Sequence, residues 1–158
     1  MDGPGNMRMK SSITASLVSQ VIGNMGLFYV CYRLSKWGWN VMPTARNSRG
    51  IDIVMYRQGA SRTHTIQVKA LSKRHPVPLC RTLDRLLGDF FVICRHIVTD
   101  SPECFVLRPD DVRVRAHRSE QEGRLSYWLQ SKDDAVNGFR DAWECTGSGL
   151  TVAPGTLQ

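Results

Sequence analysis

The first regular pattern along the chain is helical. Apolar residues recur at spacings of three and four between Ser12 and about Trp37, namely at Val18, Val21, Ile22, Met25, Phe28, Cys31 and Leu34. Ser11 or Ser12 can accept a hydrogen bond from the first free helical amides, and Gly38 stands where a helix stop is expected. The pattern therefore predicts one long helix, preceded by a flexible N-terminus at residues 1–11.

Three short β patterns follow this helix. Trp39–Met42 reads as a strand ended by Pro43, and residues 51–56 (IDIVMY) form a run rich in β-branched side chains. Residues 63–71 (THTIQVKAL) alternate between apolar and polar positions, as a strand with one buried face does. Because only a short glycine-containing segment joins the last two runs, we expect them to form an antiparallel hairpin.

The second half of the chain predicts one buried strand and several smaller elements. Residues 89–98 (DFFVICRHIV) are continuously apolar, which is typical of a strand covered on both faces. The other expected elements are a short helix at 79–88, a strand at 104–109, a helical turn at 109–113, a small strand at 127–130 and a closing helix at 133–143. Together they predict an α/β fold, with a central mixed β-sheet of four or five strands flanked by helices. Residues 12–145 would form its single domain and residues 146–158 a flexible tail.

Length and cysteine usage limit the class of protein. A chain of 158 residues is long enough to bury a core without disulfide or metal support. The five cysteines are scattered and form no CxxC pair, so neither a disulfide framework nor a zinc ribbon is indicated. No apolar run approaches the ~20 residues of a membrane span. The start of the chain lacks the layout of a secretory signal. We therefore expect a reduced protein of the cytoplasm, with no membrane partner.

Charge is distributed unevenly along the sequence. The formal net charge is +7, and the chain through Arg81 holds twelve Lys or Arg against two acids. The remainder holds nine basic residues against twelve acids. This asymmetry suggests one electropositive face and a polyanionic partner, although a solvated charged face is the alternative.

Three residues of the expected hairpin could share one site. Asp52 opens one strand, while Gln67 and Lys69 lie on one face near the end of the next. A carboxylate and an amide oxygen in one place can bind Mg²⁺, and a nearby lysine can orient water or offset phosphate charge. That is the chemistry of phosphodiester hydrolysis. The alternatives are an aspartate that closes a turn, an ordinary polar strand residue and a surface lysine.

These residues carry a resemblance to a known family. The pattern GxDxV at residues 50–54, followed by QVKA at residues 67–70, resembles the PD-(D/E)xK nuclease superfamily, which includes Holliday-junction resolvases and Mrr-like enzymes. The resemblance implies a restriction-endonuclease-like core, DNA as partner, and Mg²⁺ or Mn²⁺ as cofactor. It also implies that Asp52 binds the metal and that Lys69 lies near the attacking water. Gln67 stands where the family usually has Glu or Asp, and would be the second metal ligand.

The first helix departs from that family. Many members carry a Gly-Glu pair where this chain has Gly26 and Leu27, and we expect Leu27 to lie in the core. Asp84 could supply a carboxylate from another segment, which would make it a third metal ligand. With so few acids, two-metal catalysis is disfavoured. The chain is either a metal-dependent nuclease or a catalytically impaired DNA-binding module of a repair, mobile-element or defence complex. A subunit that binds an acidic protein is the third interpretation.

Basic residues flank the expected site on both sides. Arg46 and Arg49 precede Asp52, and Lys73 and Arg74 follow Lys69. They could contact phosphates on either side of a scissile bond, or form a solvated basic loop. The four histidines show no metal-ligand spacing, and no motif indicates a small-molecule cofactor. The family resemblance leaves a homodimer open, but the sequence identifies no dimer face.

Overall fold

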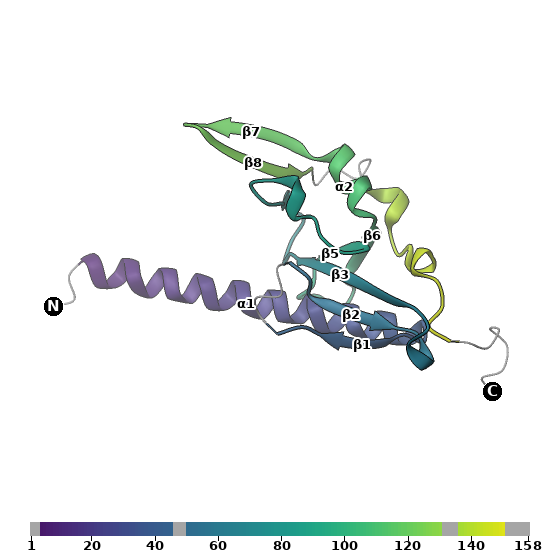
Figure 1. Ribbon diagram of the computed structural model, residues 1–158. Coiled ribbons are helices and arrows are strands. Elements are labelled where there is room, and N and C mark those ends of the chain that lie inside the picture. The colour runs from purple at the N-terminus through teal and green to yellow at the C-terminus, as the bar shows by residue number, and fades with distance from the viewer. Residues whose placement is uncertain (1–3, 46–49, 131–135, 151–158) are drawn as a thin grey trace.

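The computed structural model describes residues 4–45, 50–130 and 136–150 (Figure 1). Helix α1 (Pro4–Lys36) begins earlier than the expected start at Ser12, because proline is readily accommodated in the first helical turn. It ends where predicted, since Gly38 adopts a left-handed conformation with φ 82°. Figure 1 shows the first part of α1 extending beyond the sheet, which lies against its later turns.

The central sheet has five strands in the order β1-β2-β3-β5-β6. They are β1 (Asn40–Pro43), β2 (Ile53–Tyr56), β3 (Thr63–Ala70), β5 (Phe90–Arg95) and β6 (Glu103–Leu107). The expected hairpin is confirmed: β2 and β3 pair antiparallel, with Ile53 opposite Ile66. Strands β3 and β5 pair parallel and the other neighbours antiparallel, so the α/β class and the mixed five-stranded sheet are as predicted.

Two apolar cores lie on the two faces of this sheet. One contains Val30, Cys31 and Leu34 of α1, and Leu27 packs against it as expected. The other contains Phe91 and Ile93 of β5 together with side chains of β6, β4 and β8. All six residues of β5 are buried, which confirms the reading of that segment as a strand covered on both faces.

The apolar stripe predicted for the first helix does not form a single buried face. Cys31 and Leu34 are buried, whereas Val18, Val21, Met25 and Phe28 are exposed. The helix has apolar side chains on two sides, and the sheet covers only the side that includes Gly26, Val30 and Leu34.

A second, three-stranded sheet was largely missed by the sequence patterns. Its order is β4-β8-β7, with β4 (Val77–Pro78), β7 (His117–Gln121) and β8 (Arg124–Leu129). Helix α2 (Pro109–Arg115) leads into it from β6 and is longer than the single turn expected there. Strand β7 is too polar to resemble a strand with one buried face, because four of its five residues are exposed. Figure 1 shows the β7–β8 hairpin projecting away from the central sheet, on the side opposite α1.

Two expected helices are corrected by the structure. The segment 79–88 contains only a short 3-10 helix, Leu83–Arg85, because the backbone leaves the helical region at Leu86 (φ −76°, ψ 81°). The closing helix was expected at 133–143, of which residues 131–135 lie outside the described chain. The rest forms 3-10 helices Asn137–Phe139 and Trp143–Thr146, since the Asp141 amide donates to the Cys104 carbonyl (2.8 Å) and so attaches this segment to edge strand β6.

The described part of the expected C-terminal tail lies against the start of the sheet. The Gly149 amide donates to the Trp37 carbonyl (3.1 Å), and the Gln58 amide donates to the Gly149 carbonyl (3.3 Å). These bonds attach Gly149 to the turn between α1 and β1 and to the turn between β2 and β3. Residues 151–158 lie outside the described chain.

Candidate functional site

Asp52 lies immediately before β2, at the point where the β2–β3 pairing ends. Its amide donates to the Ile66 carbonyl (2.8 Å), and its carbonyl accepts from the Thr44 amide (2.9 Å), so its backbone is held by both neighbouring strands. The side chain then reaches along β3, where the Val68 amide donates to Asp52 Oδ2 (2.7 Å). This bond places the carboxylate beside the stretch Gln67–Lys69, which is the juxtaposition that the sequence predicted.

The surroundings of Asp52 shift the pKa of its carboxyl group in opposite directions. Burial raises the pKa of the carboxyl above its ordinary value, because the ionised form loses hydration. The Val68 amide and the charge of Lys69 act to lower the pKa. The site is therefore one in which a further cation would favour ionised Asp52.

Gln67 is a buried polar residue of β3, next in sequence to Val68, whose amide binds this carboxylate. It is 5% exposed, and its Oε1 atom has no hydrogen-bond partner among the described residues. Gly50 adopts φ 92°, and a Cβ built on it would lie 3.3 Å from Gln67 Nε2. The loop before Asp52 thus passes close to the amide group of Gln67, whose Oε1 is a buried acceptor without a donor among the described residues. Such an atom is costly to bury unless something binds it.

A cavity of about 430 Å³ adjoins Gln67. Its lining consists of Gly50, Gln67, Cys80, Arg85 and Leu87. Arg85, an exposed residue at the end of the 3-10 helix Leu83–Arg85, is part of this lining. From the sequence only the neighbouring Asp84 was expected to contribute here. The four-residue spacing of Arg81 and Arg85 is the signal that could have indicated basic residues on this segment.

Asp84 does not join the site. Its side chain is exposed, its Oδ2 accepts a hydrogen bond from the Thr82 hydroxyl (2.8 Å), and it is absent from the cavity lining. In the described residues no group of three or more His, Cys, Asp or Glu side chains could hold a metal ion. The ligand set that the structure offers near Asp52 is therefore one carboxylate and one amide oxygen, without the third ligand suggested for Asp84.

The four basic residues that were predicted to flank the site fall into two pairs, of which the structure describes only one. Lys73 and Arg74 are exposed just beyond the end of β3. Arg46 and Arg49 lie outside the described residues. Two other arginines, Arg81 and Arg124, face a groove that the sequence did not indicate.

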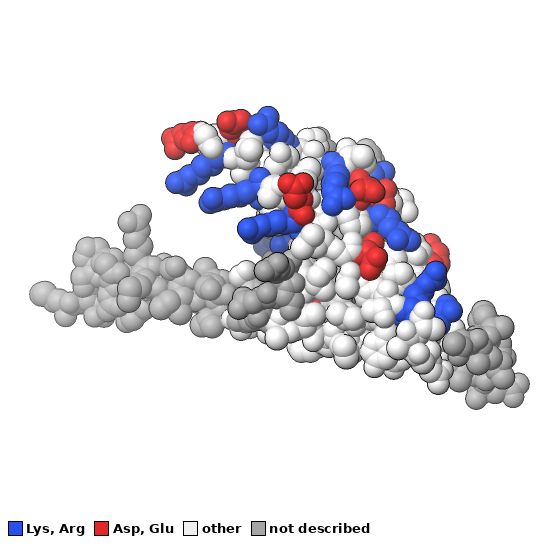
Figure 2. All heavy atoms as spheres, in the orientation of Figure 1, with Lys and Arg blue, Asp and Glu red and all other residues white. Residues whose placement is uncertain are grey.

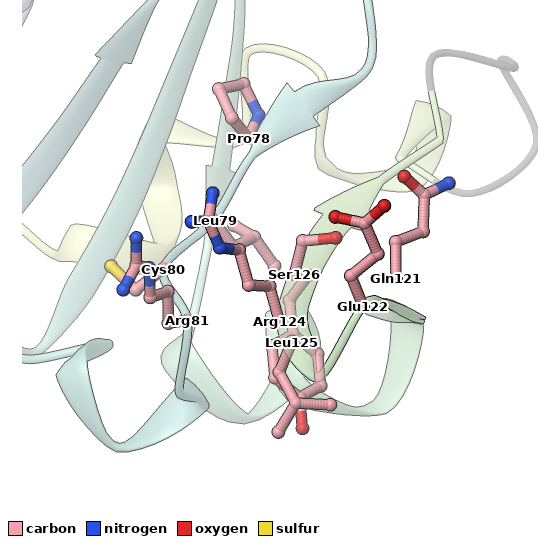
Figure 3. A pocket seen from close by; sticks show the side chains of 10 residues that line it. Pro78, Leu79, Cys80, Arg81, Gln121, Glu122, Arg124, Leu125 and Ser126 are labelled. Atoms are coloured by element: carbon pink, nitrogen blue, oxygen red, sulfur yellow. The ribbon is translucent and has the colours of Figure 1, made fainter.

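This groove lies between the segment after β4 and the β7–β8 hairpin and has a volume of about 820 Å³. Figure 3 shows Arg81 and Arg124 on its two sides, with Gln121 and Glu122 near the hairpin turn. Cys80 lines both this groove and the cavity at Gln67, so the two hollows adjoin. Figure 2 shows Lys and Arg side chains gathered below the hairpin, over the space that separates it from α1, with acidic side chains at the hairpin tip.

No family model, no curated protein and no solved structure matches this chain. In the parts of the chain that the structure describes, no helix has the length and apolar character needed to span a membrane.

Proposed function

We propose that this chain is a DNA-acting protein of the PD-(D/E)xK nuclease type, which hydrolyses phosphodiesters with Asp52, Gln67 and Lys69. The observation that carries the proposal is the anchoring of the Asp52 carboxylate on the amide of Val68, next in sequence to Gln67, whose buried Oε1 has no hydrogen-bond partner among the described residues. Asp52 lies just before β2, and Gln67 and Lys69 belong to β3, so the three residues come from the end of the β2–β3 pairing. The helix-covered mixed sheet on which they lie supports a restriction-endonuclease-like core.

The oxygen atoms at this site fit a divalent cation. Mg²⁺ and Mn²⁺ prefer carboxylate and carbonyl oxygens, and Mg²⁺ is commonly held by one or two carboxylates while it keeps several waters. Asp52 and Gln67 Oε1 would hold the ion, which would supply Lewis-acid activation of water. Lys69 would hold the attacking water or offset the charge of the scissile phosphate. The Val68 amide holds the Asp52 carboxylate in place by binding Oδ2.

The arginines around the site support a nucleic-acid substrate. Arg85 lines the cavity that Gln67 borders, and Arg81 and Arg124 line the adjoining groove. Arginine contacts to phosphate mainly position the strand and do not read its sequence. DNA would therefore lie along the groove between the segment after β4 and the hairpin, with its scissile phosphate near Gln67.

Cleavage of supercoiled plasmid and branched DNA in Mg²⁺ and in Mn²⁺ tests this proposal. The wild-type chain should nick DNA, whereas D52A and K69A should lose nicking and keep DNA binding. D84A is the matched control, because it removes an exposed acid of the neighbouring segment, and it should cleave like the wild type. Cleavage that survives D52A would overturn the assignment of the site.

Metal binding gives a second readout that does not depend on activity. Mg²⁺ should raise the free energy of unfolding of the wild-type chain by about 2.7 kcal/mol at a hundredfold excess over its dissociation constant. D52A and Q67L should abolish this stabilisation, because each removes one oxygen ligand. Equal stabilisation of all three proteins would show that the ion binds elsewhere.

One observation favours a second candidate function, a DNA-binding module that no longer cuts. Leu27 packs against the core beneath the sheet. Many members of the PD-(D/E)xK superfamily, which the sequence resembles, carry a glutamate at the corresponding position. The described residues also contain no group of three or more His, Cys, Asp or Glu side chains that could hold a metal ion. DNA binding without nicking in either metal, unchanged by D52A, would establish this function. Absence of DNA binding would reject both candidates and favour the subunit that binds an acidic protein.

A further inference from the structure

A stripe of large apolar side chains runs along α1 on the side that the sheet does not cover. Its members are all exposed and are spaced alternately by three and four residues: Val18, Val21, Met25, Phe28 and Tyr32. Phe28 is 62% exposed and Tyr32 58% exposed. The sequence from Ser11 to Tyr32 contains no charged residue, so no ionic group separates these side chains from one another. We call these five residues the α1 stripe.

The α1 stripe continues into an apolar groove beside the helix. Val18, Val21 and Met25 line a cavity of about 430 Å³ together with Ile22, Ser72 and Val98. Val98 lies just after β5 and is itself 54% exposed. The exposed surface is therefore a trough along α1 with one wall made by the loop after β5.

We propose that the α1 stripe pairs with the α1 stripe of a second copy of this chain, as an antiparallel helix pair. Alternate spacing by three and four residues is the spacing of a left-handed coiled-coil seam, in which apolar side chains of one helix insert between those of the other. Because the same stripe occurs on both copies, a twofold axis closes the interface and leaves no open end.

The direction of the pair follows from the charges of α1. The helix ends in Arg33 and Lys36, and a parallel pair would place these cations beside their counterparts. In the antiparallel pair Met25 lies opposite Phe28, and Val21 lies opposite Tyr32. The cationic last turn of each helix then lies opposite the uncharged segment before Val21 of the other. The helix dipoles also oppose each other, which favours this direction.

The exposed area is sufficient for such a pair. Each copy presents on the order of 500 Å² of apolar surface, contributed by two aromatic side chains, one methionine and three valines, with Val98 included. This area is in the upper range of apolar patches on monomeric proteins. A pair would exclude about 1,000 Å² from water, which is the lower limit of specific interfaces. The stripe carries no charge, so it is unsuited to DNA and the inference is independent of the proposed function.

Sedimentation equilibrium tests the pairing. The wild-type chain should be a dimer at about 0.1 mM. F28E should weaken dimerisation by about 100-fold or more, because it places a charge in the centre of the seam on both sides. V114E is the matched control: Val114 is an isolated valine on α2 that is 78% exposed, and the variant should dimerise like the wild type. A monomeric wild-type chain at that concentration would overturn the proposal, and so would an F28E dimer of unchanged strength.

Disulfide trapping tests the direction. In a background with Cys80 and Cys145 replaced by serine, V21C and Y32C should form a cross-linked dimer when mixed and oxidised, and neither should do so alone. Cross-links within V21C alone and Y32C alone, with none between them, would show a parallel pair and overturn the antiparallel arrangement. A chain that stays monomeric and floats with phosphatidylcholine vesicles would identify a membrane surface as the occupant instead.

Discussion

Gly26 of α1 packs directly against Ala70 of β3. A Cβ built on Gly26 would overlap the Ala70 side chain and would lie 3.8 Å from Val68 Cγ1. This contact sets how closely the helix approaches the strand that also carries Gln67 and Lys69.

Substitution of this glycine should separate the helix from the sheet. G26A should lower the free energy of unfolding by about 1–3 kcal/mol, the usual cost of an overpacked contact. G23A is the control, because nothing lies within 4 Å of a Cβ at Gly23, and it should raise stability by about 0.5–1 kcal/mol through helix propensity. Urea unfolding measures both. The double variant with A70G should recover most of the loss, and equal effects of G26A and G23A would contradict the contact.

Asp52 should make the chain less stable at neutral pH than it would be with a neutral side chain. Burial raises the pKa of the carboxyl, so the folded chain retains this proton at pH values where the unfolded chain has released it. Stability therefore falls as the pH rises through the window from the ordinary value of 3.8 to the raised pKa, and stays lower above it. D52N keeps an oxygen acceptor for the Val68 amide and should be more stable than the wild type at pH 7. The difference in stability between D52N and the wild type should shrink when the pH falls below the ordinary pKa of the Asp52 carboxyl. A D52N variant that is less stable than the wild type at pH 7 would contradict this account.

His64 should give the opposite pH dependence. Its ring lies edge-on to Trp39 and Phe90, at centroid distances of 5.5 and 5.4 Å, and burial lowers its pKa although Asp89 acts against this. The unfolded chain then binds the proton first, so stability is lost as the pH falls from about 6.5 toward the lowered pKa. NMR titration of the ring measures the pKa directly. D89N removes the opposing charge and should lower the pKa of His64 further, while H64Q should flatten this part of the stability profile.

Arg81 and Arg124 should contribute to DNA affinity through phosphates. R81Q with R124Q should weaken binding to all sequences alike and reduce the slope of log affinity against log salt by about 2, one for each phosphate contact. R62Q with R140Q is the matched control, since it removes the same charge from exposed arginines that do not line the groove. Fluorescence anisotropy at several salt concentrations measures the slope. An equal loss in both double variants would show that net charge alone governs binding.

Two of the five thiols should react with a thiol reagent in the native chain, and the other three should be protected. Cys145 is exposed and Cys80 half-buried, whereas Cys31, Cys94 and Cys104 are buried. Cys94 and Cys104 lie opposite each other on β5 and β6 with their sulfur atoms 3.2 Å apart. Their hydrogen bond, followed by burial, raises the pKa of the Cys94 thiol well above its ordinary value. Maleimide labelling followed by mass spectrometry should give two labels in the native chain and five in urea. Rapid labelling of Cys94 or Cys104 in the native chain would contradict the packing of β5 against β6.

The position of the candidate site could be predicted because its residues belong to one hairpin. Asp52 and Gln67 are brought together by strands that are adjacent in the sequence, and pairing of adjacent strands depends on local alternation and on a short turn. The neighbours of Gln67 from other segments could not be predicted in this way. Arg85 lines the cavity from a 3-10 helix, whereas Asp84, which was considered as a third metal ligand, accepts a hydrogen bond from Thr82 and is exposed.

The sequence by itself determined the long helix, the hairpin and the buried strand β5, because periodicity, turn residues and continuous apolarity act within a few residues of one another. Only the tertiary structure decided which apolar side of α1 is covered, since Val18 and Leu34 look alike in sequence and only one of them meets the sheet. It also decided that residues 136–146 attach to β6 as turns, and that the polar strand β7 pairs with β8. These outcomes depend on contacts between distant segments, whose free energy outweighs local helix or strand preference.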